Sequence, residues 1–325
     1  MNALRYQTPW TGILLIGLFM LGACSADPVT SSVPDAHTIP PSDAGGQPPV
    51  DAGSQTRDAG RHSPVDSGLL ADAGINPSPI QRGLNSLFIG HSFFIPVARG
   101  MLAHAERAGI EGHQQQTVFS GGGTGAPQAL WNNTNKSAQI KAILDQGDIE
   151  LFGLTYHPNH PGLDGYTNWI DYALERNPDL TVFIGLPWQP EPARYDSETY
   201  MTAWEVSHPS IAHGHIDALR ERYPNLTIFC IPYGEGAAVL HQLQSRGELP
   251  DVDAVQSSGD NRGIFRDRLG HGEPILIDLS QLVWLRSIYG VDLITYDHDP
   301  GYSVDLKTIA MEIVRGHSAA YSRDD

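Results

Sequence analysis

The segment Ser86-Leu-Phe-Ile-Gly-His-Ser-Phe-Phe94 says most about how this chain folds. Its apolar run, Leu87 to Ile89, predicts a short buried strand. The residues from Phe93 to Ala108 then have the pattern of a helix, and Gly90, His91 and Ser92 make the turn between them. A strand that passes through a short turn directly into a helix is the unit from which parallel α/β sheets are built.

The same pattern repeats along the rest of the chain. Short apolar runs predict strands at Leu87–Ile89, Thr117–Phe119, Ile149–Leu154, Thr181–Leu186 and Thr227–Ile231. Longer amphipathic stretches predict helices at Phe93–Ala108, Ser137–Asp145, Tyr166–Arg176, Ser197–Arg222, Glu235–Arg246, Ile275–Tyr289 and Val304–Arg315. Strands that alternate with crossover helices predict an α/β domain with a mostly parallel central sheet and helices on both faces. Ligands of such sheets bind at the carboxyl ends of the strands.

The first residues have the pattern of an export signal. Arg5 gives a positive start, Thr11 to Leu21 form an apolar core, and Leu21-Gly-Ala-Cys24 follows. This last motif resembles the lipobox of bacterial lipoproteins, in which the cysteine is lipidated and becomes the mature N-terminus. We therefore predict a signal peptide over residues 1–23 and a lipid anchor at Cys24. Ser25 after it resembles the sorting pattern of the outer membrane, so we expect a cell-envelope location.

Residues 24–79 are rich in Asp, Ala, Gly, Pro and Ser, and Asp-Ala-Gly recurs at Asp43, Asp51, Asp58 and Asp72. Such a composition buries too little apolar surface to offset the entropy lost on ordering, which predicts a disordered tether. The remaining residues, 80–325, are enough for one α/β domain.

Charge and cysteine content limit the partners of this domain. The formal net charge is −17 and no basic cluster is present, which argues against a nucleic-acid partner. Besides Cys24, the chain has one cysteine, Cys230, in an apolar run that predicts a buried strand position. An intramolecular disulfide is therefore not expected.

Four parts of the sequence could together carry acyl-transfer chemistry, which needs a nucleophile, a base, an orienting acid and donors for the oxyanion. Ser92 follows the first strand, where a helix N-terminus favours a developing negative charge. The alternative role for Ser92 is a helix N-cap, for which serine is a favoured residue. The glycine loop Gly121–Gly125 could bring backbone N–H groups close to a substrate. His271 is the candidate base, and Asp267, four residues earlier, could fix its tautomer.

With these parts in view, the chain from about Leu87 to Gly290 resembles the SGNH or GDSL-type hydrolases. Leu87-Phe-Ile-Gly-His-Ser-Phe93 is similar to that family's first block, Ser120-Gly-Gly-Gly-Thr124 to its second, and the Asp267 to His271 loop to its last. The resemblance implies a flavodoxin-like, three-layer α/β/α fold for residues 80–325. It also implies hydrolysis of esters, often acyl groups on carbohydrates or lipids.

The resemblance would make Ser92 the nucleophile, His271 the base and Asp267 the orienting acid. The N–H groups of Gly122 or Gly123 would help to bind the oxyanion. The expected substrate is a small-molecule or carbohydrate ester, and the reaction needs no cofactor and no metal.

Three features depart from the family pattern. His91 stands where the family usually has Asp or Asn before the serine. The last block is spaced Asp-x-x-x-His in place of Asp-x-x-His. The third block lacks the family's oxyanion asparagine, so Thr155 or His157 would have to replace it.

Two other classes of function remain open from the sequence. His157-x-x-His160, His213-x-His215 and Asp297-His298-Asp299 have spacings that could hold zinc in a metal-dependent hydrolase. An inactive domain could instead bind glycans on aromatic side chains, for which the candidates are Trp131, Trp169, Trp188, Trp204 and Tyr156.

Overall fold

The computed structural model describes residues 82–323. The predicted signal peptide, the lipidation site at Cys24 and the whole tether over residues 24–79 therefore lie outside the described residues, and these features stay predictions. None of the helices within residues 82–323 combines the length and the apolar character needed to cross a bilayer.

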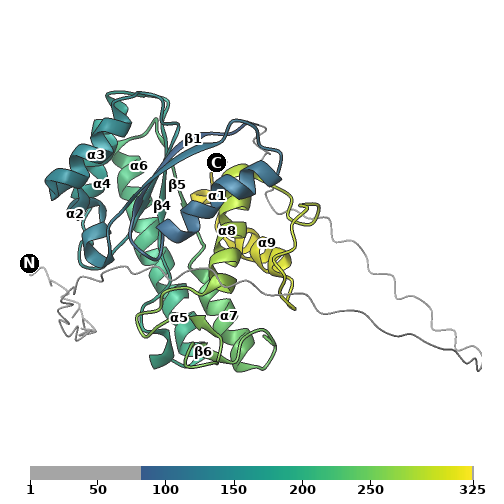
Figure 1. The fold of residues 1–325 in the computed structure, drawn as a ribbon. Coiled ribbons are helices and arrows are strands. Elements are labelled where there is room, and N and C mark those ends of the chain that lie inside the picture. Colours follow the sequence, from purple (N-terminus) through teal and green to yellow (C-terminus); the bar gives the residue numbers. More distant parts are fainter. Residues whose placement is uncertain (1–81, 324–325) are drawn as a thin grey trace, which may run out of the picture. The chain divides into compact units, whose positions relative to one another are not determined.

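A five-stranded parallel sheet forms the centre of the domain (Figure 1). Its strands are β1 (Asn85–Gly90), β2 (Gln114–Phe119), β3 (Leu151–Thr155), β4 (Thr181–Gly185) and β5 (Thr227–Ile231). They lie in the order β2-β1-β3-β4-β5, and every neighbouring pair is parallel. This is the strand order of flavodoxin-like folds, in which the sequence order reverses beside β1. The carboxyl ends of β1 and β3 therefore lie at the switch point.

Helices cover both faces of the sheet and complete a three-layer α/β/α fold. They are α1 (Ile95–Arg107), α2 (Pro127–Asn132), α3 (Thr134–Leu144), α4 (Asp164–Leu174), α5 (Ser197–Ser207), α6 (Gly214–Arg222), α7 (Glu235–Ser245), α8 (Pro274–Tyr289) and α9 (Leu306–Gly316). Figure 1 shows α2, α3, α4 and α6 on one side of the sheet, with α1, α8 and α9 on the other. The class predicted from the alternation of strands and helices is confirmed.

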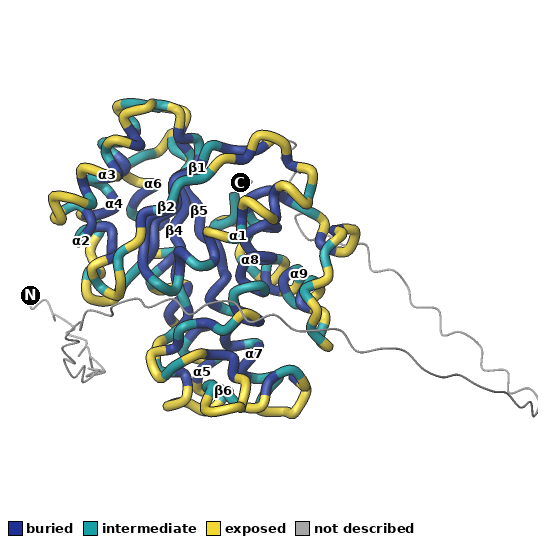
Figure 2. The backbone as a smooth tube through the Cα atoms, in the orientation of Figure 1, coloured by how far each residue is buried: buried dark blue, intermediate teal, exposed yellow. Residues whose placement is uncertain are grey.

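An aromatic cluster fixes α1 and α8 to the sheet. The Trp284 ring of α8 lies 5.5 Å from Phe88, 4.9 Å from Phe94 and 5.0 Å from Phe183, measured between ring centroids. Gly153 leaves room for these rings, because a Cβ atom there would come within 2.5 Å of Phe183. Strands β1, β3, β4 and β5 are almost entirely buried (Figure 2), so the ends of β1 and β3 are held by the packed core.

The helix predicted over Ser197–Arg222 is interrupted. Residues His208–His213 form a π-helix between α5 and α6. Pro209 has no N–H to donate to the carbonyl four residues earlier, and a proline inside a helix breaks its bonding pattern. Three features were not predicted from the sequence: this interruption, the short helix α2, and a small parallel pair, β6 (Ala254–Gln256) with β7 (Gly263–Phe265).

A buried histidine gives the fold a pH dependence. His104 of α1 lies with its Nε2 atom 3.0 Å from Gln281 Oε1 and its Nδ1 atom 2.8 Å from the Tyr296 hydroxyl. Burial lowers the pKa of His104 to about 4, and the charges of His298 and Arg107 also lower it. The hydrogen bond to Gln281 acts to raise this pKa, but its effect is smaller than that of burial. The neutral ring thus accepts at Nδ1 and donates at Nε2.

We expect the free energy of unfolding to fall as the pH is lowered from about 6.5 to about 4. In that window the unfolded histidine binds a proton that the folded one excludes, which removes up to about 1.4 kcal/mol per pH unit. Urea denaturation at pH 7, 6 and 5 would measure this slope. Other buried histidines such as His91 also have lowered pKa values, so His104→Gln should reduce the slope by up to about 1.4 kcal/mol per pH unit without abolishing it. A variant with the slope of the wild-type protein would contradict the assignment.

Candidate active site

Ser92 lies in the turn between β1 and α1, half-buried at the carboxyl edge of the sheet. Helix α1 begins only at Ile95, and its N-cap residue, Phe94, makes no side-chain cap. Ser92 is therefore not an N-cap, which removes the structural alternative for this serine. Its hydroxyl oxygen lies 2.8 Å from His271 Nε2.

His271 and Asp267 extend this contact into a chain of three side chains. His271 Nδ1 lies 2.6 Å from Asp267 Oδ2, so the carboxylate accepts the Nδ1 proton and leaves Nε2 as the acceptor facing Ser92. Asp267 Oδ1 accepts from the backbone N–H groups of Gly270 and His271. Burial acts to raise the pKa of Asp267, but these hydrogen bonds outweigh it, and the pKa lies below its ordinary value. The acid is therefore ionised at neutral pH.

The structure explains why the spacing of four residues still allows this contact. Gly270 donates to the carbonyl of Asp267 at 3.1 Å, which closes a turn over Asp267–Gly270. Gly270 has a φ of +96°, a conformation that residues with a side chain rarely adopt. The turn folds the chain back so that His271 reaches the Asp267 carboxylate.

The loop after β4 supports the turn from the side. Trp188 donates its indole N–H to the carbonyl of Gly270 at 2.8 Å, and Glu191 donates its backbone N–H to the carbonyl of Leu269 at 3.2 Å. Phe93, next to the serine, stacks on Trp188 with centroids 5.2 Å apart and meets the His271 ring edge-on at 5.3 Å. Trp188 thus links the serine turn to the histidine turn. From the sequence, Trp188 was a candidate for glycan stacking and not for this supporting role.

His91, which stands where the family pattern has Asp or Asn, joins β1 to the loop after β3. Its ring is buried, with Nε2 2.9 Å from the carbonyl of Tyr156 and Nδ1 accepting from the N–H of Phe93. Burial lowers the pKa of His91 to about 4, although the hydrogen bond to Tyr156 acts to raise it. The ring is therefore neutral and orients the turn that carries Ser92.

The glycine loop lies directly against this turn. A Cβ atom on Gly125 would come within 2.8 Å of His91 Cβ, so the two segments can approach this closely only because residue 125 is glycine. Gly122 and Gly123 are the first residues of a 3₁₀ helix, Gly122–Gly125, and Gly122 has a φ of +53°. Their N–H groups precede the first intrahelical bond and so remain available as donors.

His157 and Asn159 complete the surroundings of the glycine loop. A Cβ atom built on Gly123 would lie 3.3 Å from His157 Cε1 and 3.1 Å from the Asn159 side-chain nitrogen. His157 Nδ1 accepts from the N–H of Asn159, which leaves the ring proton on Nε2. Burial, together with the nearby His160, lowers the pKa of His157, so its ring is a neutral donor. Asn159 was not predicted from the sequence, because it lies six residues beyond Gly153 and outside the family spacing.

Thr155 does not take the position expected for it. Its side chain is fully buried, and its hydroxyl lies 3.3 Å from His91 Nε2 and 3.5 Å from the carbonyl of Gly185. The last residue of β3 points into the protein here, so Thr155 supports His91 and has no free donor for an oxyanion. The expectation that Thr155 could replace the family asparagine is wrong.

None of the three zinc spacings noted in the sequence gathers three or more ligand side chains into a metal site of its own within residues 82–323. Both nitrogens of His215 already face carbonyl groups, those of Ile211 and Pro161. Within residues 82–323, one group of histidine, cysteine or acidic side chains has the arrangement of a metal site, and it contains His213 but neither His157 nor His298.

The aromatic residues suggested for glycan stacking are mostly inaccessible. Trp169, Trp188 and Trp204 are each at most 4% exposed. Trp131 and Tyr156 are partly exposed. Because three of the five rings are buried, the residues do not form the exposed stacking surface that the binding-module alternative requires.

No protein-family model and no curated protein matches the chain. Among solved structures, the periplasmic domain of the lipopolysaccharide acetyltransferase of Salmonella ser. Paratyphi A is similar over 46% of this chain and 67% of its own, with 14% sequence identity and a TM-score of 0.32. A likeness at this level does not indicate a shared activity.

Proposed function

We propose that this protein is a serine esterase of SGNH type that hydrolyses carboxylic esters outside the cytoplasm. The observation that carries the proposal is the hydrogen-bonded chain from Ser92 through His271 to Asp267, with distances of 2.8 and 2.6 Å. A serine, a histidine with a fixed tautomer and an ionised carboxylate at hydrogen-bonding distance are the parts that covalent acyl transfer requires.

In the proposed mechanism, Ser92 Oγ attacks the ester carbonyl while His271 Nε2 takes its proton. The same histidine gives the proton to the departing alcohol, which leaves an acyl group on Ser92. A water molecule then attacks this acyl-enzyme, His271 takes the water proton and returns it to Ser92, and the acid is released. Asp267 holds the imidazole in position and stabilises the imidazolium that forms at each step.

The oxyanion would be bound by donors from two loops. These are the backbone N–H groups of Ser92 and of Gly122 or Gly123, together with His157 Nε2–H and the Asn159 amide. Asn159 lies beside Gly123, which supports the proposal that its amide replaces the oxyanion asparagine of the family's third block.

The openness of the site favours an ester whose alcohol part is bulky. The side chain of His271 is 30% exposed and that of Asp267 is 44% exposed. Acyl or acetyl esters on carbohydrate fit such a site, and a lipid anchor at Cys24 would place it at the cell envelope. Comparison of kcat/KM for the acetyl esters of a sugar and of a small alcohol tests this preference, since an open site should accept the bulkier alcohol part at least as well.

The proposed oxyanion donors can be tested by removing their side chains. Asn159→Ala and His157→Ala should each lower kcat by about 10²–10³-fold, with a smaller change in KM, because each removes a hydrogen bond made mainly in the transition state. Steady-state kinetics with nitrophenyl acetate measure both constants.

His160→Ala is the matched control, since His160 lies in the same loop and is not a proposed oxyanion donor, and burial, the larger cause, still lowers the pKa of His157 without it. It should keep kcat within about threefold of the wild-type value. An Asn159→Ala variant as active as His160→Ala would show that the amide is not an oxyanion donor.

A further inference from the structure

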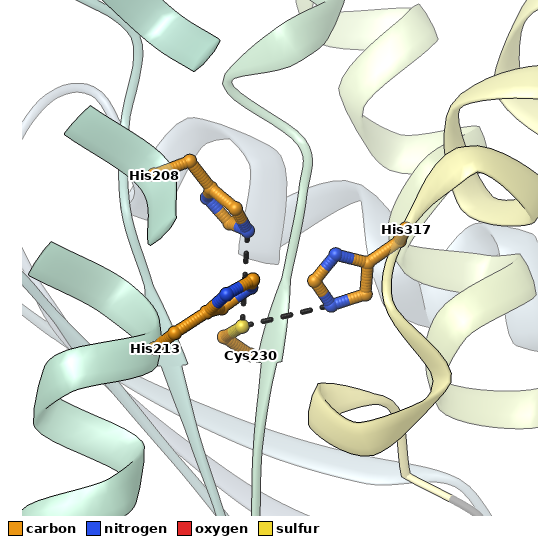
Figure 3. Close-up of side chains that lie close together, drawn as sticks. All are labelled: His208, His213, Cys230 and His317. Atoms are coloured by element: carbon orange, nitrogen blue, oxygen red, sulfur yellow. Dashed lines mark hydrogen bonds between the residues drawn. The ribbon is translucent and has the colours of Figure 1, made fainter. Parts of the chain in front are cut away.

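A second cluster of reactive side chains lies at the edge strand of the sheet. It consists of His208, His213, Cys230 and His317, and one nitrogen or sulfur atom of each lies within 4.8 Å of those of the other three (Figure 3). Cys230 Sγ is 3.6 Å from His317 Nε2 and 3.9 Å from His208 Nε2. None of the four takes part in the proposed esterase mechanism.

The π-helix is what brings two of these histidines together. In an α-helix, residues five apart point about 140° away from each other. A π-helix bonds residue i to residue i+5, so His213 returns to the same side as His208 one turn later. Cys230 comes from β5, and His317 follows the last residue of α9. Three distant segments of the chain therefore meet at the cluster.

Aromatic rings lie against two histidines of the cluster. His208 stacks on Trp204 with centroids 4.6 Å apart, and His213 stacks face to face on Tyr321 at 3.7 Å. The Nε2 atom of His213 is buried and lacks a hydrogen-bond partner among residues 82–323. A buried polar atom without a partner is unfavourable, and a bound cation would supply the missing interaction.

We propose that His208, His213, Cys230 and His317 bind one zinc ion as a structural site. One thiolate and three imidazoles are a ligand set for four-coordinate zinc. A tetrahedral zinc ion separates its sulfur and nitrogen ligands by roughly 3.6 Å, given bonds of about 2.3 and 2.0–2.1 Å. The two sulfur–nitrogen distances of 3.6 and 3.9 Å are close to this value.

The site would join three segments and leave no position for a substrate. Because the protein supplies all four ligands, the zinc has no open coordination position for a catalytic water. Binding forms a zinc–sulfur bond and releases the Cys230 thiol proton to solvent. The expected role is to fix the end of α9 and the π-helix against β5, so the proposal is independent of the esterase mechanism.

Metal analysis of the purified full-length protein tests the site. After growth with zinc and removal of loose metal, we expect about one zinc per chain, and a rise in Tm of about 5–10 °C over chelated protein. Cys230→Ser and His317→Ala should reduce the zinc content at least about tenfold. His215→Gln is the matched control, because this neighbouring histidine faces two carbonyl groups, and it should retain the zinc.

Cobalt substitution of the wild-type protein gives a test that needs no variant to fold. Cobalt bound at the cluster should produce a thiolate-to-cobalt charge-transfer band, and zinc should displace it with loss of that band. A wild-type protein that holds less than about 0.1 zinc per chain, or that binds cobalt without the thiolate band, would overturn the proposal. The proposal would also be overturned if the His215→Gln variant lost its zinc while the His317→Ala variant retained it.

Discussion

Replacing Ser92 with alanine should lower kcat for a short-chain nitrophenyl ester by about 10⁴–10⁶-fold. The substitution removes the atom that would bond to the acyl carbon, so no covalent intermediate can form. What remains would be the stabilisation of the oxyanion and the binding of the substrate, which alone accelerate attack by water about 10³–10⁴-fold. Steady-state kinetics, with an active-site titration to exclude wild-type contamination, measure the loss.

The fold should survive this change. Ser92 is half-buried and its hydroxyl contacts His271, so alanine removes a single oxygen atom and leaves the core intact. Far-ultraviolet circular dichroism and Tm should match the wild-type protein closely. Ser245→Ala, at an exposed serine on α7, is the matched control and should retain full activity. A Ser92→Ala variant that keeps more than about a tenth of the activity would exclude Ser92 as the nucleophile.

Asp267→Asn should lower kcat by about 10⁴-fold, a loss seen when the acid of a comparable triad is replaced by its amide. Asp267 Oδ1 accepts two backbone N–H groups, so the amide oxygen of asparagine would keep that position and its NH₂ group would face His271 Nδ1. The NH₂ group donates to Nδ1, which moves the imidazole proton to Nε2. His271 then has no lone pair facing Ser92.

The expected signature of this variant is a loss in kcat with little change in KM or in Tm. Asp260→Asn, in the loop between β6 and β7, is the matched control for the change of charge and should leave kcat unaltered. A loss of less than about tenfold in Asp267→Asn would mean that Asp267 does not set the tautomer of His271.

The alternation of elements could be predicted from the sequence because buried parallel strands are short, apolar and separated by helices. All five strands of the main sheet lie where the apolar runs predict them, and Cys230 is buried on β5 as expected. The π-helix could not be predicted in the same way. Its histidines have the periodicity of no regular element, and the proline that signals the interruption is compatible with several local conformations.

Some residues of the candidate site could also be predicted from the sequence, and others could not. Ser92, His271 and Asp267 were predicted from their chemistry and from their order in the chain, and the structure brings the three side chains within hydrogen-bonding distance. The roles of Thr155 and Asn159 depend on which way the β3 strand end points. A strand places alternate side chains on opposite sides, so a shift of one residue exchanges a buried hydroxyl for an accessible one. Trp188 supports the site through a hydrogen bond to Gly270, which is far away in the sequence. A local sequence pattern cannot predict such a contact.

Labelling with a fluorophosphonate probe tests the proposed function most directly. The probe should react with the folded wild-type protein at one site, and peptide mass spectrometry should place the adduct on Ser92. His271→Ala should lower the labelling rate by at least about 100-fold, because the probe needs an activated serine. A folded protein that cleaves esters while Ser92 remains unlabelled and unmodified would contradict the account.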